Sequence, residues 1–262
     1  MATMLRVLAL LLLLLMSLPS PAEHRVFTRP AQQSGLLSFL AGPDRLDVHF
    51  FRASEFALVV LDEGDEAPRY GSLQEAMRKN ACRAGINGGY FAADAKRSPL
   101  GLLRHDGVSL HRLASGSFTV AGVLYDTGRE IRLERSGKLS VAPSRMREAI
   151  QGGPFLVEAG KRVAGLERSK RARRTFVATD GRGNWCLGVS SSLTLHELAV
   201  WLSTPGCMGS FRVLTALNMD GGSSSAFWDG SDGTSFPGFK DVRNYIGIVP
   251  RRPQERKLRR TR

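Results

Sequence analysis

Three diglycine pairs, each beside a short apolar segment, restrict the fold of this chain more than any other feature of its sequence. They occur in the segments I-N-G-G-Y-F (86–91), Q-G-G-P-F-L-V (151–157) and L-N-M-D-G-G-S-S-S (217–225). Glycine at the end of a strand allows the backbone to turn sharply or to approach a ligand closely. One such pair usually marks only a turn, but three pairs with polar neighbours favour a cradle of backbone N–H groups that binds an anion.

Short apolar segments and few helix signals indicate the fold class. Strands are predicted by alternation at 46–50 and by apolar runs at 56–61, 118–125, 155–157, 185–189, 214–219 and 245–249. Capping boxes predict two helices, which begin at Ser72 and Thr194 and extend to about Asn80 and through Ser203. A weaker pattern predicts a third helix over 144–150. Because strands outnumber helices and do not alternate with them regularly, we expect an α+β fold, a single domain with a mixed, mostly antiparallel sheet and two or three short helices.

The N-terminus has the pattern of a signal peptide. Arg6 precedes an apolar run over 7–16, and a segment rich in serine and proline follows. Crossing a bilayer takes roughly 20 apolar residues. We therefore expect a signal peptide over 1–22 and export to the periplasm or out of the cell, with an uncleaved anchor as the alternative. The rest of the chain has no repeat or linker, which predicts one domain over 23–250 and a basic, disordered tail over 251–262.

The net charge of +13 is concentrated in two short segments. Residues 161–174 and 251–262 each hold seven basic residues and one acidic residue, a charge of +6 each. Neither segment has an RNA-recognition, zinc-finger or helix-turn-helix pattern beside it, and the export signal separates the protein from the genome. Nucleic acid is therefore not an expected partner. Contact of the basic segments with another polyanion is the alternative to plain solvation.

Other common catalytic classes have little support in this sequence. It contains no G-x-S-x-G or H-E-x-x-H motif, and its five histidines are dispersed. Cys82, Cys186 and Cys207 have no zinc or redox spacing, although an oxidising compartment permits a disulfide between Cys186 and Cys207. No cofactor is firmly predicted. Calcium or magnesium could bind through Asp220, because hard cations need only oxygen ligands.

The motifs in their order along the chain resemble the phosphodiester glycosidase family, whose members cut a sugar from a phosphodiester attached at its anomeric carbon. The motifs are N-G-G-Y-F at 87–91, G-G-P-F-L-V at 152–157 with Gly160 three residues later, Arg174-Thr175 and, after a helix, D-G-G-S-S-S at 220–225. The resemblance spans about 84–249 and is closest to a bacterial exported branch of the family. Ala178 and Ser223 stand where the family often has glycine, a change that would reshape the substrate pocket.

The resemblance implies a hydrolase that acts on sugar 1-phosphodiesters in exported or envelope glycans. The leaving phosphate is a stable anion, so the site needs charge stabilisation more than a strong general acid. Arg174 has the planar guanidinium that holds two phosphate oxygens. Asp220 would activate water, attack the anomeric carbon or bind a cation, and Asn87 would hydrogen-bond to the sugar or the phosphate. The structural alternatives are a solvated arginine in a basic segment and two turn residues.

Further substrate contacts are expected from residues beside these three, namely Gly88, Gly89, Gly152, Gly153, Thr175, Gly221, Gly222 and Ser223. A second carboxylate is not evident. Asp180 and Glu197 are candidates, but a turn explains the first and the capping box explains the second, so both retaining and inverting mechanisms stay open. The rival interpretation is a noncatalytic envelope module that binds anionic glycans through its basic segments.

Overall fold

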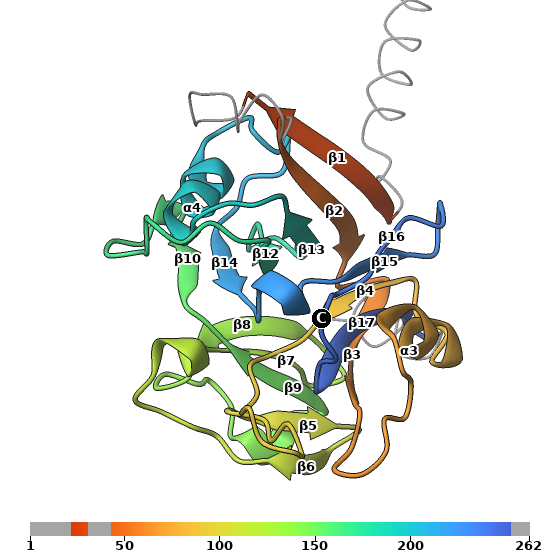
Figure 1. The fold of residues 1–262 in the computed structure, drawn as a ribbon. Coiled ribbons are helices and arrows are strands. Elements are labelled where there is room, and N and C mark those ends of the chain that lie inside the picture. Colours follow the sequence, from red (N-terminus) through yellow and green to blue (C-terminus); the bar gives the residue numbers. More distant parts are fainter. Residues whose placement is uncertain (1–21, 31–42, 253–262) are drawn as a thin grey trace, which may run out of the picture.

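The computed structural model describes residues 22–30 and 43–252. The expected signal peptide, except Ala22, and the expected tail, except Arg251 and Arg252, lie outside these residues. Within them the chain forms three antiparallel sheets and only two α-helices (Figure 1). The expected α+β class is therefore wrong, because the fold is β-rich, whereas the expected antiparallel pairing is found. None of the helices in this part of the chain has the length and apolar character that crossing a bilayer requires.

The largest sheet has seven strands. Their order is β1 (Glu23–Arg29), β2 (Asp44–Arg52), β13 (Asn184–Ser190), β12 (Thr175–Thr179), β14 (Thr215–Asn218), β10 (Phe155–Glu158) and β11 (Lys161–Arg162). The second sheet has the order β16 (Ser235–Phe236), β15 (Phe227–Asp229), β4 (Ala84–Asn87), β17 (Asn244–Pro250) and β3 (Phe56–Asp62). The third has the order β6 (Val108–His111), β5 (Leu103–His105), β9 (Glu148–Gly152), β7 (Gly122–Asp126) and β8 (Ile131–Arg135).

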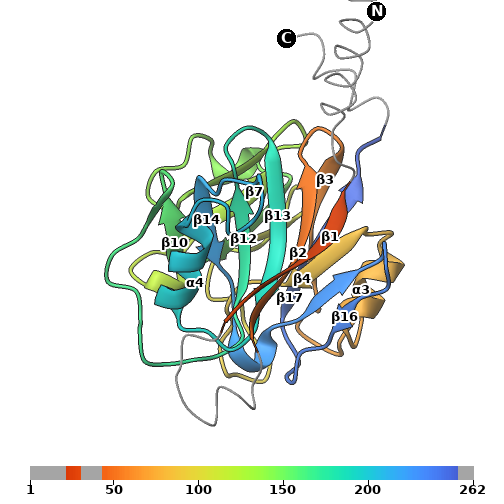
Figure 2. The ribbon, with the colours of Figure 1, turned by 90° about the horizontal axis from the view of Figure 1, so that it is seen from above.

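The two α-helices begin where the sequence predicts. Thr194 caps α4 (Leu195–Ser203) with a complete capping box, and Ser72 accepts a hydrogen bond from the first turn of α3 (Leu73–Lys79). Figures 1 and 2 show α4 and α3 on opposite sides of the molecule. α4 packs on the seven-stranded sheet through a buried face that includes Trp201, and Met77 of α3 packs against β4 and β17.

The third predicted helix is wrong. Residues 144–150 lie partly in a short 3₁₀ helix, η2 (Pro143–Arg145), and partly in strand β9. The sequence does not indicate a buried strand here, because a charged residue such as Glu148 is unusual on one. Its carboxylate is buried and accepts hydrogen bonds from the backbone N–H groups of Val60 and Asp106. Because β3 lies at the end of the second sheet, the Val60 N–H has no neighbouring strand on that side, and the Glu148 carboxylate is its acceptor instead.

The three sheets share one hydrophobic core, which includes Val60, Ile86, Ile150 and Leu217. The core extends to the C-terminal end of the described chain, where Arg251 is buried and its Nη2 lies 2.8 Å from the Asp126 carboxylate. Arg251 therefore belongs to the folded domain and not to the basic tail in which the sequence places it.

The three cysteines are free thiols. The disulfide that the sequence permits between Cys186 and Cys207 is not formed. Cys82 and Cys186 are buried, and burial raises the pKa of Cys82 to about 12. Cys82 therefore stays protonated and unreactive at neutral pH.

Candidate functional site

The ends of three strands meet at Asn87, the last residue of β4. Its Nδ2 donates a hydrogen bond to the backbone oxygen of Asp220 at 2.7 Å. Its Oδ1 accepts from the Thr175 hydroxyl at 2.7 Å and from the Ala226 N–H at 3.0 Å. Asn87 is buried, so these bonds form away from water. The structure therefore brings together Asn87, Thr175 and Asp220, which lie far apart in the sequence.

The first diglycine pair allows close packing and leaves no open cradle of N–H groups. A Cβ on Gly88 would lie 2.1 Å from Oδ1 of Asn244. The Gly88 N–H donates to the Asn244 backbone oxygen, and the Gly89 N–H donates to Asn244 Oδ1, both at 2.8 Å. The Gly88 oxygen accepts from the Asp220 N–H at 3.1 Å. The backbone donors expected to bind a substrate anion are already bonded within the protein.

The other two pairs are bonded in the same way. The Gly153 N–H donates to the backbone oxygen of Asn218 at 2.8 Å, and the Gly222 N–H donates to that of Arg173 at 2.8 Å. Gly221 donates to the side chain of Asp220 at 2.9 Å. A Cβ on Gly152 would lie 2.7 Å from the sulfur of Met219, so this glycine packs closely against that side chain. The glycines thus allow close packing around Asp220, and the N–H groups named here have partners within the protein. Substrate contact by these glycines stays a prediction.

Two side chains that the sequence did not single out, those of Asn218 and Tyr90, are bonded to each other next to this group. Asn218 Nδ2 donates to the Tyr90 hydroxyl at 2.8 Å, and that hydroxyl donates to the Gly153 oxygen at 3.0 Å. Burial raises the pKa of Tyr90, the negative charge of Asp220 raises it further, and Arg174 lowers it. Tyr90 is therefore within electrostatic reach of both the acid and the base that the sequence assigned to one site.

Asp220 is a half-buried carboxyl group at the end of β14. Burial raises its pKa, while hydrogen bonds from Ser224 and the Gly221 N–H and the charge of Lys240 lower it. A carboxylate with a raised pKa is a better base when it is ionised. Ser223 is exposed on the adjoining 3₁₀ helix η3 (Gly222–Ser224), the short blue helix near the centre of Figure 1.

Arg174 is held by backbone oxygens next to the start of β12. Its Nε donates to the Leu193 oxygen at 3.0 Å, and its Nη2 donates to the Lys170 oxygen at 2.5 Å. The side chain is 11% exposed, and burial lowers its pKa. Its nearest described acid is Glu167, at 3.8 Å. Arg174 thus forms no ion pair with Asp220, and its remaining donors are the ones that a ligand could use.

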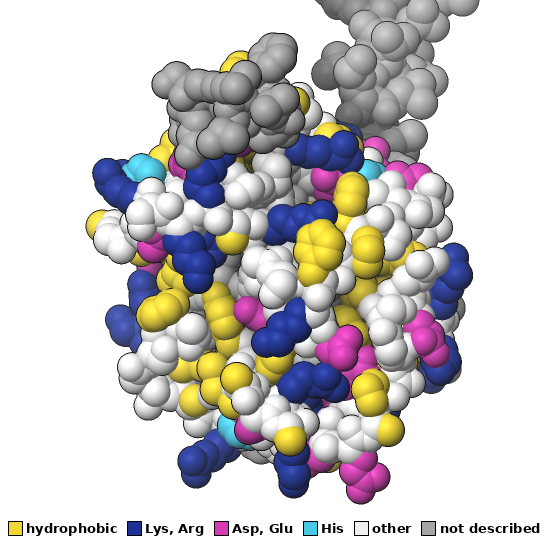
Figure 3. Space-filling view, viewed as in Figure 1, with side chains coloured by type: hydrophobic (Ala, Val, Ile, Leu, Met, Phe, Trp, Pro, Cys, Tyr) yellow, Lys and Arg dark blue, Asp and Glu magenta, His cyan; other side chains and the backbone are white. Residues whose placement is uncertain are grey.

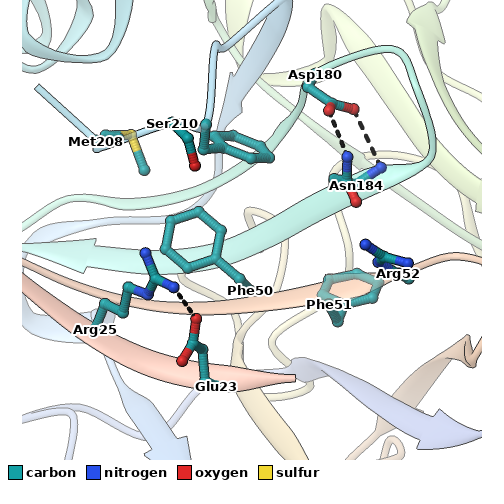
Figure 4. A pocket seen from close by; sticks show the side chains of 10 residues that line it. Glu23, Arg25, Phe50, Phe51, Arg52, Asp180, Asn184, Met208 and Ser210 are labelled. Carbon is teal, nitrogen blue, oxygen red and sulfur yellow. Dashed lines mark hydrogen bonds and ion pairs between the residues drawn. The ribbon is translucent and has the colours of Figure 1, made fainter. Parts of the chain in front are cut away.

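The two alternative carboxylates do not join this group. Asp180 follows β12 at the end opposite to Arg174, and a strand of this length separates them by roughly 20 Å. Asp180 lines a cavity of about 270 Å³ that Asp220 and Arg174 do not line, and its carboxylate accepts hydrogen bonds from Asn184 there (Figure 4). Glu197 completes the cap of α4 and pairs with Arg171 at 2.5 Å. Asp220 is therefore the candidate acid of the site.

The metal hypothesis concerns the carboxylate of Asp220. Among residues 22–30 and 43–252, no group of three or more histidine, cysteine, aspartate or glutamate side chains could hold a metal ion. Binding of calcium or magnesium at Asp220 stays a prediction.

Comparison with protein families and solved structures agrees with the motifs. The model of a family described as phosphodiester glycosidase matches residues 80–249. The catalytic domain of zebrafish N-acetylglucosamine-1-phosphodiester alpha-N-acetylglucosaminidase, auto-inhibited by its pro-peptide, has a similar structure, with a TM-score of 0.64 at 16% identity over 89% of this chain and 85% of that one. No curated protein sequence matches the chain.

Two further solved structures are similar. A hypothetical protein from Synechocystis has a TM-score of 0.55 at 15% identity, over 88% of this chain and 64% of that one. A protein from Burkholderia pseudomallei K96243, whose description suggests export, has a TM-score of 0.54 at 14% identity, over 80% and 74% of the two chains. At these identities the likeness establishes a common fold.

Proposed function

The chain belongs to the phosphodiester glycosidase family, and from this we propose that it hydrolyses the bond between the anomeric carbon of a sugar and a phosphodiester. The observation that carries the proposal is the carboxyl group of Asp220. It is half-buried, its pKa is raised, and it lies where three of the family-like motifs meet. The zebrafish enzyme of similar fold acts, by its name, on a sugar 1-phosphodiester.

The proposed reaction is a displacement at the anomeric carbon. Ionised Asp220 takes a proton from a water molecule, whose oxygen forms a bond to that carbon. The bond from this carbon to the phosphate oxygen breaks, and its electron pair leaves with the phosphate, giving a free sugar and a phosphomonoester. Because the leaving group is an anion, nearby positive charge stabilises the transition state. Arg174 and Lys240 are the candidate sources of that charge, and Asn87 holds the Asp220 backbone.

The proposed setting is outside the cytoplasm, in the periplasm or the secreted fraction. The signal-like segment at 1–22 and the exported character suggested for the Burkholderia protein support it. Substrates there would be phosphorylated glycans of the envelope or of an exopolysaccharide.

The test is hydrolysis of a panel of sugar 1-phosphodiesters by the purified protein. Asp220→Asn should abolish turnover, because the amide cannot accept the proton. Arg174→Ala should reduce kcat/KM. The matched control is Asp180→Asn, which changes the same residue type at the opposite end of β12 and should leave turnover unchanged.

Two outcomes would contradict the proposal. Turnover by Asp220→Asn equal to that of the wild type would remove the assigned base. Absence of turnover across the panel, together with salt-sensitive binding of anionic glycans that is lost when 253–262 are deleted, would favour the noncatalytic binding module.

A further inference from the structure

Phe239 is the most exposed large hydrophobic side chain among the described residues, at 80% exposure. Single exposed hydrophobic residues are common, so exposure alone indicates nothing. This ring, however, is fixed next to the candidate site. The N–H groups of Phe239 and Lys240 both donate to the Ser223 oxygen, at 2.7 and 3.1 Å. Gly238 lies so close to η3 that a Cβ on it would be 3.2 Å from the Ser224 oxygen.

One cation lies over the Phe239 ring, and the charge of a second acts on the Asp220 carboxyl group. The guanidinium carbon of Arg173 is 5.1 Å from the centre of the Phe239 ring, and the Arg173 backbone accepts the Gly222 N–H. Lys240 Nζ is 4.9 Å from the centre of the Phe91 ring. Neither cation forms an ion pair with an acid in the part of the chain that the structure describes, and Arg173 Nη1 donates a hydrogen bond to the Pro237 oxygen at 3.4 Å. Figure 3 shows basic and hydrophobic side chains side by side near the centre of the face that Figure 1 presents.

The order of groups in the substrate decides what this arrangement can bind. In a sugar 1-phosphodiester the phosphate lies between the anomeric carbon and the second esterified group. The anomeric carbon must lie at Asp220, where water is activated. The phosphate comes next and meets the positive charges already assigned to it, those of Arg174 and of Lys240, whose charge acts on Asp220. The group beyond the phosphate then lies over the exposed ring.

Resting on the proposed function, we propose that Phe239 is the platform for the second esterified group, while Arg174 and Lys240 hold the phosphate and Arg173 lies against the ring. The substrate class is then a sugar 1-phosphodiester whose second group is a ring, either a sugar or an aryl group. The apolar face of such a ring packs on an aromatic side chain, whereas a methyl group covers little of it.

The test compares two substrates that share the sugar and differ only in the second group, one methyl and one phenyl. Phe239→Ala should reduce kcat/KM for the phenyl diester roughly tenfold, the factor that corresponds to about 1.4 kcal/mol. It should change kcat/KM for the methyl diester less than about twofold. Phe239→Trp should retain the preference for the phenyl diester. The matched control is Val108→Ala, which shortens another exposed side chain, on β6, and should change neither substrate.

A second readout does not need turnover. Wild-type protein should bind phenyl phosphate more tightly than methyl phosphate in calorimetry, and Phe239→Ala should remove the difference. If Phe239→Ala lowers kcat/KM equally for both diesters, or for neither, Phe239 is not the platform. Turnover of the diesters by the wild type would still support the proposed function. No turnover of either diester by the wild type, and none of any other member of the panel, would remove the proposed function. Equal binding of the two phosphates would then remove the platform as well.

Discussion

Asn87→Ala tests whether one buried amide holds the separate motifs together. The substitution removes three hydrogen bonds, to the Asp220 oxygen, the Thr175 hydroxyl and the Ala226 N–H. Each such bond contributes about 1 kcal/mol, so the free energy of unfolding should fall by about 3 kcal/mol. The Thr175 hydroxyl, the Ala226 N–H and the Asp220 backbone oxygen would also be left without this partner, which lowers the free energy of unfolding further.

Urea denaturation followed by tryptophan fluorescence measures this change. The matched control is Asn184→Ala, whose side-chain amide bonds Asp180 at a half-exposed position away from the site. That variant should lose less than about 1 kcal/mol. A loss for Asn87→Ala no larger than the loss for Asn184→Ala would refute the idea that Asn87 joins the motifs.

Two further predictions concern packing and pH. Gly153→Ala should lower the free energy of unfolding by roughly 3 kcal/mol, because its Cβ would lie 1.9 Å from a backbone oxygen, whereas Gly137→Ala meets no atom within 4 Å and should be neutral in thermal unfolding. Hydrogen bonds to the carboxylates of Asp47 and, to a smaller extent, Asp232 raise the pKa of His24 above 6.5. This stabilisation is complete below pH 6.5 and is lost as pH rises through the folded-state pKa. His24→Gln should therefore lower Tm more at pH 5.5 than at pH 9, and an equal change at both would contradict the reasoning.

The helix starts were predicted correctly from the sequence, whereas the third helix and the fold class were not. The caps at Ser72 and Thr194 appear as predicted, because a cap depends on residues three positions apart. The prediction for 144–150 was wrong because Glu148 is stabilised by backbone N–H groups of Val60 and Asp106, which lie far away in the sequence. No pattern along the chain reveals such partners. The predicted fold class was wrong for the same reason, since strands with buried polar residues are hard to recognise in a sequence.

At the candidate site too, some residues could be predicted from the sequence, and their partners from distant segments could not. The motifs indicated Asn87, Thr175 and Asp220 for one site, and the structure joins these three residues by hydrogen bonds. Their role in a reaction stays a prediction. The expected donors of Gly88 and Gly89 are bonded to Asn244, which lies far away in the sequence. Tyr90 and Asn218 were overlooked as partners because each lies within a segment whose apolar neighbours indicated only a strand or a turn.

The position of bond cleavage tests the central proposal most directly. The wild-type protein would hydrolyse a sugar 1-phosphodiester in isotope-labelled water, and mass spectrometry would locate the label in the products. A glycosidase that activates water at Asp220 places the label on the anomeric carbon of the sugar. Label in the phosphate instead would show attack at phosphorus and would contradict the proposed reaction.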